Sequence, residues 1–209
     1  MTIDASLALP PFQYRGEVTP KDLIVLHFTA GTTAEAAMAW WKQTPERVAT
    51  AFIVDVDGQI LQAFDPKFWA PHLGIIGDNN VTDRRSIGIE IVNPGPLRLK
   101  GQMLYWWPPA MQFGTPYCGV GEISKYVKLE TPWRGERYFA AYPEPQVVAV
   151  CELVRDLCEK FQIPSTIPAE EIRGEHSPFF KSWDGIAGHH NYRKDKSDPG
   201  PAWPWGRLL

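Results

Sequence analysis

Two short runs of branched apolar residues restrict the folds open to this chain more than any other feature. Residues 22–28 read DLIVLHF and residues 85–93 read RSIGIEIVN. Runs of this length and composition predict strands that are buried inside a sheet. Within the apolar part of each run stands one ionisable side chain, His27 or Glu90, which is costly in an apolar setting unless the group is paired or used in chemistry.

His27 and Glu90 each allow a structural and a functional interpretation. A histidine at the end of a central strand can be a core residue satisfied by backbone groups, which is the commoner case for an isolated histidine. It can also be a ligand held on a rigid element. Glu90 would face solvent if its strand lay at a sheet edge, but the apolar flanks favour a buried carboxylate on the face opposite Ile89 and Ile91.

The other periodic segments predict a framework around these two strands. They are an extended N-terminal arm (1–20), a helix (34–41), a hairpin that turns at an Asp-Gly pair (51–64), a longer helix with an apolar stripe (145–161) and a last short strand (184–189). A chain of 209 residues with this content suits a single domain.

Between residues 94 and 142 the apolar periodicity breaks down. Proline, glycine and aromatic residues are interleaved there without a helix or strand period. A loop this long inside a compact domain is usually functional. We therefore predict an aromatic-rich insertion at about 97–140 that forms part of a groove wall, with a short hairpin around residues 119–130.

Composition narrows the classes of function. The net charge of −3 gives no argument for binding nucleic acid or an anionic membrane surface. No apolar run reaches the length of a membrane span, and the first residues lack the basic and apolar regions of a signal peptide. The three cysteines include no CxxC pair, which favours a reduced compartment.

A polar stretch near the end of the chain gathers an imidazole, an ammonium and a carboxylate within ten residues. These are His189, Lys196 and Asp198, and the Pro-Gly-Pro turn that follows restricts the backbone around the carboxylate. Taken alone, the stretch is equally consistent with a polar surface loop.

Read together with the two buried strands, this stretch predicts a hydrolytic metal site. His27, His189 and Asp198 offer two imidazoles and a carboxylate, a three-ligand set for Zn²⁺ that leaves a fourth position open to water. Glu90 would act as general base and Lys196 would stabilise an oxyanion. Hydrolysis of an amide is the reaction class that follows.

Six stretches across the chain carry a resemblance to a known family. They read LIVLHFTAG (23–31), AFIVDVDGQI (51–60), APHLG (70–74), SIGIEIVNPG (86–95), YPEPQ (142–146) and GHHNYRKDKSDPGPAWPW (188–205). In this order they resemble the type-2 N-acetylmuramoyl-L-alanine amidases, a superfamily shared with peptidoglycan-recognition proteins and the lysozyme-type amidases of phages. The resemblance implies an α/β (α+β) fold with a mixed central β-sheet flanked by helices.

The resemblance also implies the site and the reaction. Zn²⁺ would lie on His27, His189 and Asp198, with Glu90 and Lys196 catalytic, and the enzyme would cut between the lactyl group of N-acetylmuramic acid and L-alanine. His72, in a loop, is either a substrate contact or a surface residue, and we assign it with Asn93 as the candidate substrate contacts.

Some positions depart from the family pattern. Ala51 stands where members often have a histidine, and the spacing from His189 to Asp198 is one residue shorter than the commonest form. That spacing leaves His190 as a second candidate ligand, although the Gly-His register favours His189, and His176 is a weaker rival. The insertion has no strong counterpart in the shortest members.

Two other functions compete with a peptidoglycan amidase. One is a recognition module that binds peptidoglycan or muropeptide without cutting it, and the other is a zinc amidase for a different amide. We expect a monomer that binds peptidoglycan or muropeptides and no nucleic acid. The absence of a signal peptide leaves a cytoplasmic enzyme or a phage endolysin that reaches the cell wall by lysis.

Overall fold

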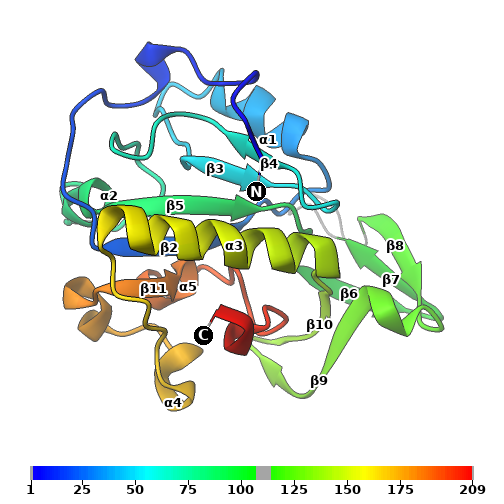
Figure 1. Cartoon of the computed structure of the whole chain (residues 1–209). Coiled ribbons are helices and arrows are strands. Elements are labelled where there is room, and N and C mark those ends of the chain that lie inside the picture. Colours follow the sequence, from blue (N-terminus) through cyan, green and yellow to red (C-terminus); the bar gives the residue numbers. More distant parts are fainter. Residues whose placement is uncertain (1, 107–113, 209) are drawn as a thin grey trace.

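A mixed six-stranded sheet forms the centre of the protein, whose computed structural model describes residues 2–106 and 114–208. The strand order is β1-β4-β3-β5-β2-β11 (Figure 1). Of the neighbouring pairs, β3–β4 is antiparallel and the other four are parallel. The strands are β1 (Ile3–Asp4), β2 (Leu23–Phe28), β3 (Phe52–Val54), β4 (Ile60–Gln62), β5 (Ser86–Ile91) and β11 (Gly185–Gly188). The predicted mixed central sheet is confirmed.

The two apolar runs form the central strands β2 and β5, which pair in parallel with His27 opposite Glu90. Successive residues of β2 enter different clusters, Leu26 the large core and Val25 a smaller one. Because side chains alternate along a strand, His27 lies on the Val25 side of the sheet. Its in-register partner Glu90 lies on the same side, so the two ionisable groups are neighbours on one face.

Helix α3 (Glu144–Phe161) covers the other face of the sheet and lies in front of β5 and β2 in Figure 1. Its apolar stripe, which includes Val150 and Val154, joins the large core cluster that also holds Ile89. Helix α1 (Ala34–Trp41) begins after Thr33, whose hydroxyl accepts a hydrogen bond of 3.2 Å from the amide of Ala36. Both helices were predicted from the sequence.

The insertion is a second sheet rather than a loop. Its five antiparallel strands have the order β8-β7-β6-β10-β9. They are β6 (Pro96–Lys100), β7 (Met103–Trp106), β8 (Thr115–Gly119), β9 (Tyr126–Trp133) and β10 (Glu136–Ala140). The predicted hairpin around 119–130 is wrong, since the tight hairpins join β6 to β7 and β9 to β10. Residues 107–113 of the insertion lie outside the described residues.

Short helices flank the strand ends. They are η1 (Pro11–Gln13), α2 (Val81–Arg85), η2 (Ile123–Lys125), α4 (Glu170–Arg173), η3 (Pro178–Ser182), α5 (His189–Tyr192) and η4 (Trp205–Leu208). Elements this short contain too few turns for apolar periodicity to reveal them. Among the described residues, no helix has the length and apolar character needed to cross a membrane.

Candidate metal centre and active site

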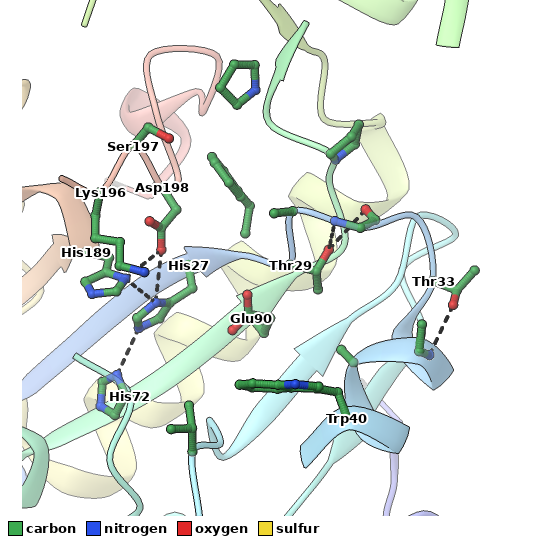
Figure 2. A pocket seen from close by; sticks show the side chains of 18 of the residues that line it. His27, Thr29, Thr33, Trp40, His72, Glu90, His189, Lys196, Ser197 and Asp198 are labelled. Atoms are coloured by element: carbon green, nitrogen blue, oxygen red, sulfur yellow. Dashed lines mark hydrogen bonds and ion pairs between the residues drawn. The ribbon is translucent and has the colours of Figure 1, made fainter. Parts of the chain in front are cut away.

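Three potential metal ligands meet where the central parallel strands end, on the face of the sheet away from α3. Leu26 of β2 is paired with Gly188 of β11, so His27 and His189 are the next residues on two neighbouring strands. His189 also begins helix α5. Asp198 returns to them from the loop after α5, and Figure 2 shows the three side chains converging.

The ligand atoms form a compact triangle. Nδ1 of His27 lies 3.0 Å from Nδ1 of His189 and 3.0 Å from Oδ2 of Asp198, and the His189 nitrogen lies 2.9 Å from that same oxygen. All three residues are buried. Tetrahedral Zn²⁺ with bonds of about 2.0–2.2 Å holds its ligand atoms about 3.3–3.6 Å apart, so a small outward movement would admit the ion.

The second ring nitrogen of His189 determines its tautomer. Nε2 lies 2.9 Å from the carbonyl oxygen of Leu73, which can only accept a hydrogen bond. Nε2 therefore carries the proton, and the network assigns a free lone pair to Nδ1, the atom in the triangle.

A chain of hydrogen bonds assigns the same tautomer to His27. The hydroxyl of Ser86 donates to the carbonyl oxygen of Asp83 (3.2 Å), so it accepts from Nε2 of His72, 2.8 Å away. Nδ1 of His72 then accepts from Nε2 of His27 at 2.9 Å. Nδ1 of His27 is left without a proton and points into the triangle.

Three lone-pair acceptors therefore face one another with no hydrogen to share. Burial, assisted by His189, lowers the pKa of His27 to about 4, although Asp198 opposes the shift. Burial would raise the pKa of Asp198, but when His189 or His27 carries a second proton, its charge and hydrogen bond hold the pKa of Asp198 well below its usual range. A neutral imidazole and an ionised carboxylate are the forms that bind Zn²⁺, and a cation would remove the repulsion between the lone pairs.

Glu90 places a carboxylate beside the triangle. Burial and the negative charge of Asp198 raise the pKa of Glu90 to about 8, while Lys196 opposes them. Within the described parts of the chain, no side chain or backbone group hydrogen-bonds its carboxylate, which lines the cavity that opens from the triangle. Glu90 lies on the face opposite Ile89, as predicted, but it is partly exposed to the cavity instead of fully buried.

The cavity has a volume of about 690 Å³ and several walls. Lys196 belongs to the segment after α5, and Figure 2 shows its amine near His189 and Asp198. Trp40 of α1 forms an aromatic wall. Arg98 of β6 and Glu136 of β10, whose Nη2 and Oε1 atoms lie 3.2 Å apart, bring the insertion sheet to the same cavity.

The two candidate substrate contacts have other partners. His72 lines the cavity beside His27, and both of its ring nitrogens are hydrogen-bonded, so it also orients the His27 ring. Asn93 is buried, its amide donates to the carbonyls of Ala140 and Ala141, and its oxygen accepts from the amide of Gly95. Asn93 is not among the described residues that line the cavity. Its hydrogen bonds connect the end of β5 to the end of β10.

The rival histidines lie outside the triangle. The ring nitrogens of His190 lie 2.9 Å from the carbonyl oxygen of Asp198 and 2.8 Å from that of Arg173. His176 is exposed and belongs to no ligand group found in the described parts of the chain. The geometry therefore selects His189, as its register after a glycine suggested.

Three residues of the cavity wall, Trp40, Arg98 and Glu136, were not predicted from the sequence. Trp40 could have been found, because helical spacing places Ala34, Met38 and Trp41 on the buried face and leaves Trp40 beside it. Arg98 and Glu136 could not, because they reach the cavity through the pairing of β6 with β10, which the sequence did not predict.

Comparison with known proteins identifies the family. The family model described as N-acetylmuramoyl-L-alanine amidase matches residues 17–201. The fold resembles that of AmiD from E. coli, solved with anhydro-N-acetylmuramic acid-L-Ala-D-gamma-Glu-L-Lys (TM-score 0.55, 21% identity, 98% of this chain, 59% of that chain). It also resembles the XlyA catalytic domain (0.54, 16%, 95% and 90%) and an AmpD derivative (0.51, 17%, 100% and 97%). No curated protein sequence matches. With most of its length matched, this chain belongs to the N-acetylmuramoyl-L-alanine amidase family.

Proposed function

We propose that this protein hydrolyses the amide bond between N-acetylmuramic acid and L-alanine in peptidoglycan or in muropeptides, with Zn²⁺ as cofactor. The proposal rests on one observation, the convergence of three buried lone-pair acceptors on His27, His189 and Asp198 at the end of a cavity. Glu90 and Lys196 line the same cavity, and membership of the amidase family supports the choice of amide.

The residues present fit Zn²⁺. Two imidazoles and one carboxylate with a fourth position open to the cavity are a common catalytic donor set. When bound, the ion would supply Lewis acidity, lowering the pKa of a water molecule and polarising the amide carbonyl. His72 and the carbonyl of Leu73 hold the outer nitrogens of His27 and His189, which fixes ring orientation and tautomer.

Glu90 moves the protons of the reaction. Its carboxylate, with no hydrogen-bond partner among the described residues, can accept a proton from the attacking water and return it to the departing nitrogen of L-alanine. The pKa of about 8 belongs to the metal-free protein. A divalent cation nearby lowers the pKa of a carboxyl group, so Glu90 is ionised when attack begins.

Lys196 stabilises the charge that develops on the amide oxygen. Its ammonium lies at the cavity beside Asp198, on the same side as the ligand triangle (Figure 2). A fixed cation in a site with little water is worth more than the same charge in bulk solvent. Lys196 also lowers the pKa of Glu90 and so favours its basic form.

A cleavage assay with two substrates tests the proposal. Anhydro-muramyl tripeptide, the ligand of the AmiD structure, represents soluble muropeptides, and purified sacculi represent intact peptidoglycan. We expect a new L-alanine amino terminus from at least one of them, loss of activity after chelation and recovery with about one Zn²⁺ per chain. Binding of both substrates without cleavage would support a recognition module, and zinc content without either binding or cleavage would support a different amide.

A further inference from the structure

The turn between β9 and β10 joins the insertion sheet to the segment that carries Lys196 and Asp198. Arg134 and Gly135 form this two-residue turn, with positive φ angles of 52° and 83°. Positive φ at both positions suits a tight hairpin. From the turn, the guanidinium group of Arg134 leaves the sheet and contacts residues 190–196.

Arg134 donates hydrogen bonds to several backbone carbonyls in this short segment. Its acceptors are the carbonyl oxygens of His190 (3.1 Å from Nη2) and of Arg193 (3.4 Å), Lys194 (3.0 Å) and Lys196, the last three from Nη1. They belong to α5 and to the residues after it, where carbonyl groups lack partners within the helix. A planar guanidinium can serve several such acceptors at once, which an ammonium cannot do in the same geometry.

Trp133 holds the guanidinium in place. The centre of the Arg134 guanidinium lies 4.6 Å from the Trp133 ring, and the same ring packs edge-on against His190 with centroids 5.3 Å apart. Nε1 of Trp133 donates to the carbonyl of Gly174 at 3.2 Å. The end of the β9–β10 hairpin is therefore attached to the region around α5 by stacking as well as by hydrogen bonds.

The two ends of the 193–198 loop are anchored differently. At the Asp198 end, the carbonyl of Asp198 accepts from the backbone amide of His190 (3.0 Å), and the hydroxyl of Tyr142 donates to the carbonyl of Pro199 (2.7 Å). At the Lys196 end, the Lys196 amide donates to the carbonyl of Arg193 (3.2 Å), and the Arg193 side chain pairs with Asp195 (3.0 Å) and reaches the carbonyl of Leu73 (3.5 Å). Across the described residues, Arg134 is the group from outside the loop that binds the carbonyls of this end.

We propose that Arg134 is a positioning residue that holds the 193–198 loop and thereby sets the Lys196 ammonium at the cavity. The insertion sheet then has a catalytic purpose in addition to forming a wall. The effect on turnover rests on the proposed function, because it acts through Lys196. The effect on the loop rests on the contacts alone. The metal ligands depend less on Arg134, since His27 and His189 are fixed by β2, β11 and α5.

Two arginines of one hairpin give a matched test. Arg137 also donates to two carbonyls, those of Leu129 (3.2 Å) and Glu130 (2.7 Å), but these lie within β9 and not in the 193–198 loop. We would prepare Arg134→Ala, Arg134→Lys and Arg137→Ala as zinc-loaded full chains. The measurements are peptide-level hydrogen exchange over residues 193–198, zinc content, and kcat and KM for anhydro-muramyl tripeptide.

Arg134→Ala should speed exchange in the 193–198 loop by about 10- to 100-fold, the loss expected for charge-assisted hydrogen bonds. The value of kcat should fall by about 10- to 100-fold, with KM and zinc content nearly unchanged. Arg134→Lys should be intermediate, and Arg137→Ala should resemble the parent protein.

Three results would overturn the inference: unchanged loop exchange in Arg134→Ala, equal effects of Arg134→Ala and Arg137→Ala, or faster exchange with an unchanged kcat. A parent protein that binds zinc but cleaves neither substrate would instead count against the proposed function. The catalytic part of the inference would then fail together with the proposed function, because it acts through Lys196. The exchange measurement would still decide whether Arg134 holds the 193–198 loop.

Discussion

The two sheets of this protein carry ionisable groups in opposite ways. The central strands β2 and β5 are almost wholly buried, and each holds one ionisable residue, His27 or Glu90, inside an apolar run. The strands of the insertion sheet are half exposed, and their charged residues lie in water or in surface pairs such as Arg98–Glu136. Burial shifts the pKa values of His27 and Glu90 on the first sheet, whereas the charged side chains of the second sheet keep contact with water.

This contrast indicates a division of work. Reactive groups need fixed geometry and little water, which a buried parallel sheet supplies. Groups that shape the cavity or hold a loop can lie at the surface, where the chain tolerates change. We therefore expect substitutions on the central sheet to abolish chemistry and comparable substitutions on the insertion sheet to modulate it.

The adjacent histidines of α5 give the largest expected difference. His189 belongs to the ligand triangle at the central sheet, and His190 packs against the insertion sheet. His189→Ala removes a ligand from the triangle and should abolish stable zinc binding and reduce cleavage to background. His190 packs against Trp133 of the insertion sheet, so His190→Ala should keep most of the zinc. Zinc measured by elemental analysis after gel filtration checks both. Zinc loss in His190→Ala alone would reassign the ligand.

Two carboxylates at the same cavity give the next largest difference. Glu90→Gln, which is nearly isosteric, should reduce kcat by about 10²–10⁴ while zinc content and muropeptide binding persist, because a positioned base is lost. Glu136→Gln, on β10 of the insertion sheet, should change kcat less than about tenfold and act mainly through KM. Steady-state kinetics and calorimetric binding measure both. Parent-like cleavage by Glu90→Gln would show that Glu90 is structural.

Buried leucines compare the stability of the two cores. Leu26 and Leu104 are both fully buried, in the large core and in the small core of the insertion sheet. Each Leu→Ala change should reduce the free energy of unfolding by about 2–5 kcal/mol, measured by urea titration. Leu26→Ala should also weaken zinc binding, because Leu26 precedes His27, and Leu104→Ala should not. Equal zinc loss in both would show that the two regions are coupled.

The smallest expected effect is a pH dependence of stability in the zinc-free protein. Because burial raises the pKa of Glu90 from its ordinary value of 4.5 to about 8, the folded state binds more protons than the unfolded state between these pH values. The contribution of Glu90 to stability should therefore fall as the pH rises from about 4.5 to 8. The lowered pKa of His27 acts in the opposite direction up to about pH 6.5, so the fall in stability should be clearest from about pH 6.5 to 8. Urea midpoints in the presence of a chelator should show a weaker decline in Glu90→Gln. Parallel curves would contradict the buried, raised carboxyl group.

The same contrast explains what the sequence could predict. β2, β5, α1 and α3 have strong apolar patterns, and the ligand triangle follows from strands that end side by side. The insertion sheet was missed because its strands are half exposed and rich in aromatic residues on both faces. Neither the two-residue apolar period of a strand nor the helical period therefore appears in the sequence. Asn93 was assigned to substrate because its burial against Ala140 depends on β10, and Arg134 was missed because its acceptors are backbone groups.

The place of the insertion also determines where this chain can change in length. The chain leaves the central sheet after β5 and returns before α3, and the amide of Ala140 donates to the carbonyl of Gly95 at 2.9 Å, so the two ends of the insertion lie together. Residues added or removed between these points leave the pairing of His27 with Glu90 untouched. One extra residue within β2 or β5 would turn the following side chains to the opposite face. Insertions and deletions should therefore be tolerated best in the turns of the insertion away from Arg134, and hardly at all in the central strands.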